Sequence, residues 1–166
     1  MENPKIDLDK IIIEPFPENP TCILRHEPGK IRYDYKLSGF FNENEIGHLT
    51  ISLMHHLENL RKRDNFWFDL SKKPPVIRPF VFFQKTEEAY RGQGVSGRLI
   101  VLANELSKIK FGQPLYSSIS FVPNYFPIWD KKPKFEQPGK RVWEKLERDG
   151  LAKSCPYHGK PRWVMI

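Results

Sequence analysis

The stretch that decides the fold is Val76 to Gly112, which reads VIRPFVFFQKTEEAYRGQGVSGRLIVLANELSKIKFG. Residues 79–84 are apolar and rich in phenylalanine, which predicts a buried β-strand. Residues 85–90 form a polar bend, and residues 91–97 form a turn that contains three glycines. From Val95 onward, apolar residues recur at spacings of four, three, four and three, which predicts an amphipathic helix. The rest of the chain is organised around this strand, bend, turn and helix.

The predicted helix has clear signals at its C-terminal end. Lys108 and Lys110 suit the negative end of the helix dipole. Gly112 suits the position just after the last helical residue, and Pro114 follows it. The apolar stripe predicted to face the core consists of Val95, Leu99, Leu102, Leu106 and Ile109.

The glycine turn has the chemistry of an anion-binding site. The first N–H groups of a helix have no partners within the helix, and the helix dipole adds partial positive charge there. Glycines let a backbone approach a phosphate closely and permit positive φ angles. A turn that needs glycine for its geometry alone is the plainer interpretation. Three glycines next to Arg91 favour a phosphate-bearing ligand instead.

Three phosphate-binding patterns compete for this turn. The P-loop does not match, because no Lys-Ser or Lys-Thr follows the last glycine. Gly92, Gly94 and Gly97 match the dinucleotide fingerprint G-x-G-x-x-G. However, a polar stretch separates the strand from the first glycine, and no acid follows about 20 residues later to bind a ribose. A small dinucleotide-dependent oxidoreductase is therefore the weakest of the three interpretations.

The third pattern is the segment Arg91 to Ser96, which resembles motif A of the GNAT superfamily of N-acetyltransferases, written Q/R-x-x-G-x-G/A. Arg91 takes the first position and Gly94 the fourth, while Ser96 stands at the sixth in place of Gly or Ala. The order of predicted elements after the turn is also similar to that of GNAT proteins. The resemblance covers roughly residues 20–166. It implies a single α/β (α+β) domain with a mixed, mostly antiparallel sheet flanked by helices.

The resemblance implies an acetyl-CoA-dependent N-acyltransferase that moves an acetyl group directly to an amine. The glycine turn would hold the pyrophosphate of acetyl-CoA, and the strand near residues 84–86 would offer backbone groups to the pantetheine arm and the thioester carbonyl. The residues expected to bind the cofactor are Gln84, Lys85, Thr86, Arg91, Gly92, Gln93, Gly94, Val95, Ser96 and Gly97.

Direct transfer requires a base for the amine and an acid for the departing thiol. For the base, the residue types present leave four candidates, which are Glu87, Glu88, His55 and His56. For the acid, they leave Tyr116, Ser117, Ser118 and Tyr125. We take Glu88, Tyr116 and Ser118 as the catalytic candidates. Trp143 stands where many GNAT proteins have the tyrosine that acts as acid.

The 166 residues suffice for one domain with a proper core. We expect an irregular N-terminal arm over residues 1–20, which contains four prolines, and a GNAT-like domain over residues 21–166. Two cysteines far apart predict reduced thiols, no disulfide framework and a cytoplasmic protein. The N-terminus does not resemble a secretory signal, no apolar run is long enough for a membrane span, and no metal site is predicted.

The remaining chain predicts further strands and one further helix. Two strands, residues 21–26 and 31–38, flank a Pro-Gly turn. Residues 42–63 fit a helix or a strand; we favour a strand at 46–53, followed by a short helical turn, because it would pair with the next strand. The later elements predicted are a strand at 113–122, a proline-rich loop at 123–138 that could serve as a lid, a short helix at 139–150, and a hairpin of residues 151–156 and 161–166.

A non-catalytic module of the same fold is the alternative function. It would bind acyl-CoA or nucleic acid without turnover. The net charge of +7 and the basic segment 131–166 could attract nucleic acid, but they equally suit the phosphates of a cofactor, which we prefer. The acceptor could be a small molecule or a protein: a protein terminus, a lysine, an aminoglycoside, a polyamine and a nucleic acid all fit the sequence, as do a monomer and a homodimer.

Overall fold

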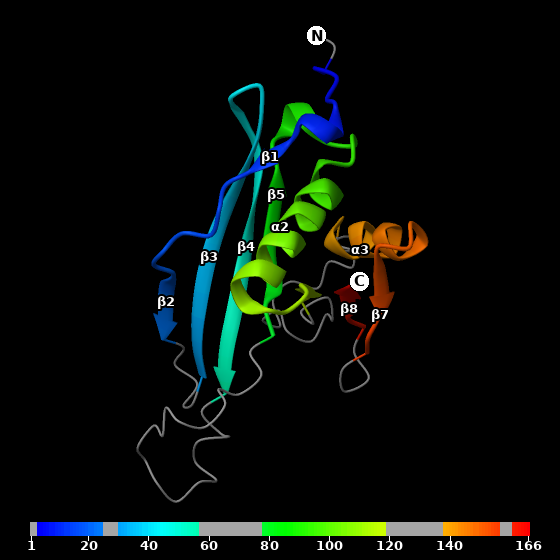
Figure 1. Ribbon diagram of the computed structural model, residues 1–166. Coiled ribbons are helices and arrows are strands. Elements are labelled where there is room, and N and C mark those ends of the chain that lie inside the picture. The colour runs from blue at the N-terminus through cyan, green and yellow to red at the C-terminus, as the bar shows by residue number, and fades with distance from the viewer. Residues whose placement is uncertain (1–2, 25–29, 57–77, 119–137, 157–160) are drawn as a thin grey trace, which may run out of the picture.

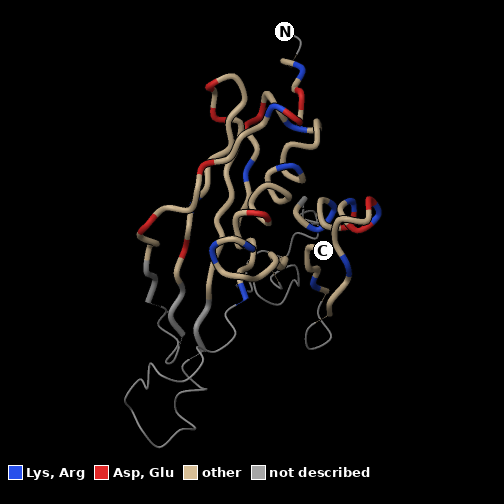
Figure 2. The backbone as a smooth tube through the Cα atoms, in the orientation of Figure 1, with Lys and Arg blue, Asp and Glu red and all other residues tan. Residues whose placement is uncertain are grey.

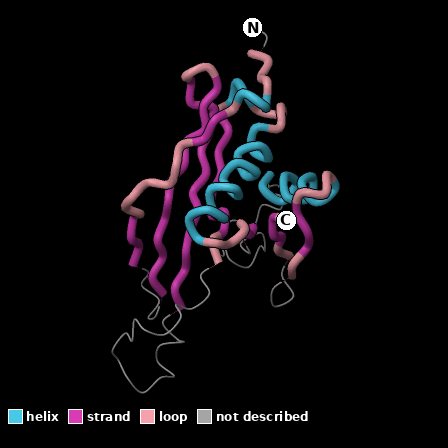
Figure 3. The backbone as a smooth tube through the Cα atoms, viewed as in Figure 1, coloured by secondary structure: helices cyan, strands magenta, loops and turns pink. Residues whose placement is uncertain are grey.

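The computed structural model describes residues 3–24, 30–56, 78–118, 138–156 and 161–166, which form a twisted sheet and two α-helices (Figures 1 and 3). The helix α2 lies across one face of the sheet, and α3 lies beside it next to β7 (Figure 1). The elements in chain order are η1 (Leu8–Lys10), β1 (Ile12–Ile13), β2 (Thr21–Leu24), β3 (Lys30–Phe41), β4 (Asn44–His56), β5 (Phe80–Thr86), η2 (Glu88–Tyr90), α2 (Val95–Phe111), β6 (Tyr116–Ser117), α3 (Pro138–Arg148), β7 (Ala152–Ser154) and β8 (Trp163–Met165).

The strands of the described residues, eight in number, form one mixed sheet in the order β1-β3-β4-β5-β6-β8-β7, with β2 also paired to β3. The neighbouring strands are antiparallel except for β5 and β6, which run parallel. The parallel pair is possible because α2 carries the chain from the end of β5 back to the start of β6. The predicted mixed α/β class with a mostly antiparallel sheet is therefore confirmed.

The long hairpin of β3 and β4 is the centre of the sheet. Its turn consists of Asn42 and Glu43, both with positive φ, as the right-handed twist of a tight hairpin requires. Alternate residues of β3 point toward α2, and among them Leu37 is fully buried while Tyr35 is nearly so. Leu37 pairs with Leu49 of β4, which is also fully buried. The alternation of apolar and polar residues thus places one face of this hairpin in the core.

The strand predictions agree with the structure in position and differ in length. The ambiguous segment 42–63 contains β4, which pairs with β5 as its antiparallel partner, so the strand interpretation is confirmed. His55 and His56 are the last residues of this strand, because β3 extends far enough to pair with them. Strand β6 covers only two residues of the predicted segment 113–122. Strand β4 also continues through residues 54–56, where the short helical turn was predicted to begin, because β3 pairs with it there. The rest of that predicted turn, residues 119–122, the loop at 123–137 and Tyr125 lie outside the described residues.

The helix α2 is confirmed, but its predicted apolar stripe is partly wrong. Ile109 is 82% exposed, and Leu102 and Leu106 are only half-buried. The buried face instead consists of Val95, Leu99, Ile100, Ala103, Asn104 and Ser107. Two polar residues therefore occupy the C-terminal half of the buried face, where apolar periodicity cannot detect them.

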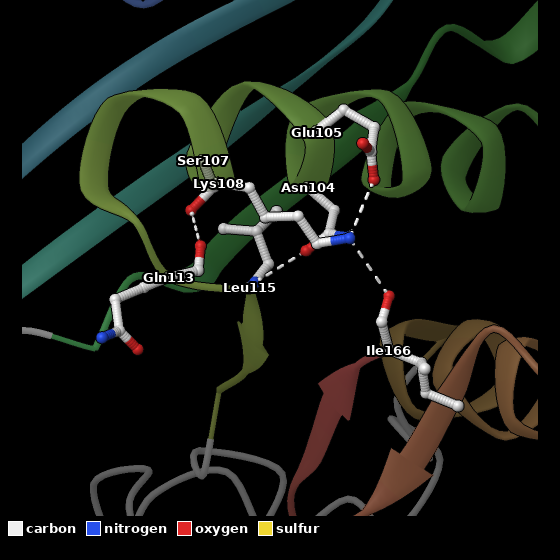
Figure 4. Close-up of polar contacts among 7 residues, drawn as sticks. All are labelled: Asn104, Glu105, Ser107, Lys108, Gln113, Leu115 and Ile166. Carbon is white, nitrogen blue, oxygen red and sulfur yellow. Dashed lines mark hydrogen bonds and ion pairs between the residues drawn. The ribbon is translucent and has the colours of Figure 1, made fainter.

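These polar residues hold the chain as it leaves the helix (Figure 4). The Asn104 side-chain oxygen accepts a hydrogen bond from the backbone N–H of Leu115 at 3.0 Å. The Ser107 hydroxyl donates to the backbone oxygen of Gln113 at 2.8 Å. The first contact is buried and the second partly buried, and together they turn the chain beneath α2 so that it can enter β6. Gly112, with a φ of 64°, ends the helix as predicted.

The N-terminal arm is not wholly irregular, because it packs onto the sheet and onto α2. Ile11 is buried, and β1 pairs with the end of β3. Further along, the Phe16 ring meets the rings of Tyr35 and Phe111 edge-on, at centroid distances of 5.4 and 5.1 Å. The ammonium group of Lys110 lies within about 6 Å of all three rings, a favourable cation–π arrangement. This aromatic cluster joins the arm, β3 and the end of α2.

The C-terminal helix and hairpin match their predictions. Helix α3 ends next to Gly150, and β7 and β8 form the final antiparallel pair. Trp143 is fully buried between these elements and the rest of the core. The Trp163 indole N–H donates to the Glu147 carboxylate at 2.8 Å, which ties β8 to α3. Among the described residues, no helix has the length and apolar character needed to cross a bilayer.

Candidate functional site

An open cleft of about 1200 Å³ lies where the end of β5, the glycine turn, the start of α2 and one side of α3 meet. This volume exceeds the roughly 300–1,000 Å³ of most small-molecule sites, so the cleft has room for a ligand of nucleotide size or larger. Its lining residues are Leu8, Gln84, Lys85, Thr86, Tyr90, Arg91, Gly92, Gln93, Gly94, Val95, Ser96, Gly97, Arg98, Val101, Gly139, Val142, Lys145, Leu146, Asp149 and Leu151.

One wall of the cleft is the part of β5 that leaves its parallel neighbour. In the part of the chain that the structure describes, β5 pairs with β6 only at Phe80 and Val81. The strand continues to Thr86, and its last three residues line the cleft. The pairing of β5 with β4 shifts between Val81 and Phe83, so Phe82 is a β-bulge. The strand therefore bends and presents backbone groups to the cleft where a sheet neighbour would otherwise bind them.

The floor of the cleft is the glycine turn and the start of α2. Gly92 and Gly94 have φ angles of 76° and 85°, which side-chain-bearing residues rarely adopt. Gly94 is the N-cap of α2, and without a side chain it cannot cap the first helical N–H groups. The Thr86 and Ser96 hydroxyls are hydrogen-bonded at 2.7 Å, which holds the end of β5 against the first turn of the helix. The helix start is thus open toward the cleft and fixed in place.

Four basic side chains and one acidic side chain line the cleft. The Lys85 ammonium pairs with Glu87 at 3.0 Å, and the Lys145 ammonium pairs with Asp149 at 2.6 Å. Arg91 and Arg98 differ from these lysines, because no carboxylate among the described residues lies within ion-pair distance of either guanidinium. Figure 2 places basic residues at the start of α2 and along α3, where acidic residues are interspersed. The two arginines are therefore the side chains that can neutralise a bound anion.

The opposite wall comes from α3, which the sequence did not connect with the site. Val142 and Leu146 line the cleft and lie closest to the position that a Cβ on Gly97 would occupy, at 3.9 and 3.8 Å. The small Gly97 therefore lets α3 pack near the first turn of α2. The amphipathic pattern of α3 predicts that one face is buried, but it does not identify the partner, because that contact joins residues more than 40 positions apart.

All ten residues expected to bind a cofactor line this one cleft. The three catalytic candidates do not. Glu88 is exposed on η2, outside the cleft lining. The Tyr116 ring makes cation–π contacts with the guanidinium groups of Arg78 and Arg162, at 5.7 and 5.1 Å from the ring centroid. Ser118 is buried at the end of β6.

Two of the other candidates for proton transfer, Ser117 and Glu87, are engaged in contacts that stabilise the fold. The Ser117 hydroxyl is buried and accepts a hydrogen bond from the backbone N–H of Trp163 at 2.9 Å. Glu87 pairs with Lys85 at the end of β5, and its backbone N–H binds the Ile46 oxygen at 2.9 Å. The side chains of His55 and His56 lie outside the described parts of the structure.

Two buried polar atoms near the bend of β5 have no hydrogen-bond partner among the described residues: the Gln84 side-chain oxygen and the Nδ1 atom of His48. Gln84 lines the cleft, so a ligand there could donate to its oxygen. His48 on β4 is the cross-strand partner of Lys85, so its side chain lies on the face of the sheet opposite to that of Gln84. Burial lowers the pKa of His48, and the ammonium groups of Lys36 and Lys85 lower it further, although Glu45 at 3.6 Å opposes them.

Comparison with known proteins finds no match among protein-family models, curated proteins or solved structures.

Proposed function

We propose that the protein is an acetyl-CoA-dependent N-acyltransferase that transfers an acetyl group directly to an amine. One observation carries the proposal: the ten residues that the motif resemblance assigns to the cofactor meet in a single cleft at the start of α2. A turn that used glycine for its geometry alone would not require the strand end, the helix start and two arginines without carboxylate partners to converge on one cavity.

The cleft fits the chemical parts of acetyl-CoA. The open helix start and the guanidinium groups of Arg91 and Arg98 suit a pyrophosphate. No atom of the described residues lies within 4 Å of the place where a Cβ on Gly92 would stand, which suits a turn that is open to a ligand there. The end of β5 suits the pantetheine arm, because that arm carries amides that can pair with strand backbone in the manner of an added strand.

The protein's own groups would act on the reaction in two ways. Acetyl-CoA supplies an acetyl group activated as a thioester. The amine nitrogen forms the new C–N bond as the C–S bond breaks, the amine loses a proton to a base, and the thiolate gains one. Backbone N–H groups at the end of β5, near Gln84 and Thr86, would stabilise the negative charge that develops on the carbonyl oxygen. The strand and the helix start would also hold the thioester in position for attack.

A second candidate is a non-catalytic module that binds acyl-CoA without turnover. It is favoured by the positions of Glu88, Tyr116 and Ser118, none of which is part of the cleft lining, and by the buried Trp143 at the place of the expected tyrosine. A base and an acid could still come from the amine acceptor, from water or from other residues. Both candidates require acyl-CoA binding, and only the enzyme requires thiol release.

The deciding experiment combines binding and turnover on the same preparation. Acetyl-CoA is titrated calorimetrically, and free thiol is then measured over a panel of amines that contains lysine peptides, polyamines and aminoglycosides. The enzyme predicts saturable binding and amine-dependent thiol release. The non-catalytic module predicts binding without release. An absence of binding at millimolar acetyl-CoA would eliminate both.

A further inference from the structure

The N-terminal arm lies against the glycine turn and touches it at three points. The backbone of Pro4 and Ile6 contacts the side chain of Gln93, and the Leu8 side chain lines the cleft. A Cβ built on Gly94 would lie 3.3 Å from the Leu8 side chain. Figure 1 shows this first segment, in blue, beside the start of α2. The arm is therefore part of the wall around the expected phosphate position.

Gln93 anchors the arm with both ends of its side-chain amide. Its Oε1 atom accepts a hydrogen bond from the Ile6 N–H at 3.0 Å, and its Nε2 atom donates to the Pro4 oxygen at 2.9 Å. This paired arrangement satisfies the amide in the way that a neighbouring strand would. Both polar atoms of the Gln93 side chain are thus hydrogen-bonded to the arm. Gln93 was expected to bind the cofactor, but its side chain instead holds the arm.

Arg98 lies one helical turn after Gly94 and is held by the same arm. Its Nε atom donates to the Leu8 oxygen at 3.0 Å, which fixes one edge of the guanidinium. Within the described ranges, the two terminal nitrogens have no recorded partner, and no carboxylate pairs with the group. Arg91 has the same arrangement, because its Nε atom donates to the Thr86 oxygen at 3.3 Å. In both arginines the terminal nitrogens remain available to an anion in the cleft.

We propose that Arg98 binds a phosphate of the ligand and that Gln93, through the arm, positions it. Gln93 orders residues 4–8, and the ordered Leu8 carbonyl then orients the Arg98 guanidinium toward the helix start. A guanidinium held on one edge loses less conformational freedom when its other edge binds a phosphate. The identity of the ligand as a CoA thioester rests on the proposed function, whereas the phosphate contact does not.

The test is a double-mutant cycle on the full chain with CoA and inorganic pyrophosphate as separate probes. The variants are Arg98→Ala, Gln93→Leu and the double variant, with Lys108→Ala as a control that removes one positive charge at the far end of α2. Arg98→Ala should weaken CoA binding about tenfold or more. Gln93→Leu should weaken it about threefold to tenfold, although it removes no charge. The double variant should match Arg98→Ala within about twofold, because Gln93 acts through Arg98.

The salt dependence of Kd separates positioning from a merely structural role. Both Arg98→Ala and Gln93→Leu should reduce it, since each removes the same cation from the ligand, whereas a general loosening of the turn would leave it unchanged. Ile6→Pro breaks the same anchor from the side of the arm and should repeat the effect of Gln93→Leu if that variant folds poorly.

The outcomes distinguish the two proposals. If the parent binds CoA and Gln93→Leu binds it equally well, or if the effects of the two variants are additive, the positioning role is wrong and the proposed function stands. If pyrophosphate binding shows the predicted effects of the single and double variants but CoA binds no more tightly than pyrophosphate, the positioning role stands and the proposed function fails. If neither probe binds the parent, both are wrong.

Discussion

His48 lies at a position where protonation opposes folding. Burial and the ammonium groups of Lys36 and Lys85 lower its pKa in the folded chain, and Glu45 only partly offsets them. In the unfolded chain, a histidine has a pKa of about 6.5. The neutral form is therefore favoured more in the folded state than in the unfolded state.

This difference predicts a specific pH dependence of stability. Because the folded pKa is lowered, the contribution of His48 is fully present above about pH 6.5 and is lost as pH falls from there through the folded pKa. The unfolding free energy of the parent should thus fall more steeply between pH 7 and pH 5 than that of His48→Gln. Carboxylates contribute equally to both proteins and cancel in the comparison. Chemical denaturation at several pH values measures the difference, and two curves of equal slope would show that His48 is not in this environment.

At the same scale, a sequence motif identifies backbone chemistry better than side-chain roles. The turn was expected to use glycines because they permit positive φ angles, and Gly92 and Gly94 have such angles. Glu88 and Tyr116 were chosen for their chemistry and their position in the sequence, yet they do not line the cleft. Arg98 lines it without having been predicted, although its place one turn after Gly94 was a usable signal, because such a residue shares the face of the helix start.

The helix α2 shows how a polar pair can replace part of an apolar stripe. Its first half follows the predicted pattern through Val95 and Leu99. Its second half buries Asn104 and Ser107, because the chain returns beneath the helix and needs hydrogen-bond partners there. Periodicity counts apolar residues only, so it assigned this face to Ile109, which is exposed. The backbone groups that Asn104 and Ser107 bind lie after the end of the helix, so the pattern of the helix alone cannot show which of its faces is buried.

Asn104→Leu should therefore destabilise the protein by about 1–3 kcal/mol, although it makes the helix more apolar. The substitution leaves the buried N–H of Leu115 without the acceptor that Asn104 supplies at 3.0 Å. Ile109→Ala, at a side chain of the same helix that is 82% exposed, is the control and should change stability by no more than about 0.5 kcal/mol. Equilibrium urea unfolding of both variants checks the prediction. Equal stability of the two variants would mean that the Asn104 contact contributes nothing.

At the scale of the whole molecule, the aromatic cluster links parts of the chain that are distant in sequence. Phe16 joins the arm to Tyr35 on β3 and to Phe111 at the end of α2. Phe16→Ala should lower the unfolding free energy by about 2 kcal/mol, less than for a fully buried ring because Phe16 is half-buried. Ile12→Ala, at a side chain that is 66% exposed in the same arm, should cost less than about 1 kcal/mol. If both variants unfold alike, Phe16 does not join these elements.

The fold as a whole was largely predictable because its strands and helices carry strong local patterns. The central hairpin alternates, and α2 is bounded by glycines at each end. The arm was expected to be mainly irregular, whereas β1, η1 and the Gln93 contacts give it a defined path. The contacts of Gln93 and Arg98 with the arm join residues 87 to 90 positions apart, and no local pattern reports a pairing at that distance.

The central claim is that the glycine turn binds the pyrophosphate of acetyl-CoA. Gly94→Leu places a side chain at the helix start and forces a residue with a Cβ into a φ of 85°, at a cost of about 1–3 kcal/mol. Gly112→Leu is the matched control, because Gly112 has a φ of 64° at the other end of α2, away from the cleft. Both variants should keep a cooperative melt and the circular dichroism of the parent.

Calorimetric titration of acetyl-CoA into the parent and these two variants is the most direct measurement. We predict that the parent and Gly112→Leu bind with the same Kd, while Gly94→Leu binds at least about tenfold more weakly, because its side chain occupies the space of the phosphate. Binding of acetyl-CoA by folded Gly94→Leu as tightly as by the parent would contradict the account, and the glycines would then serve only the geometry of the turn.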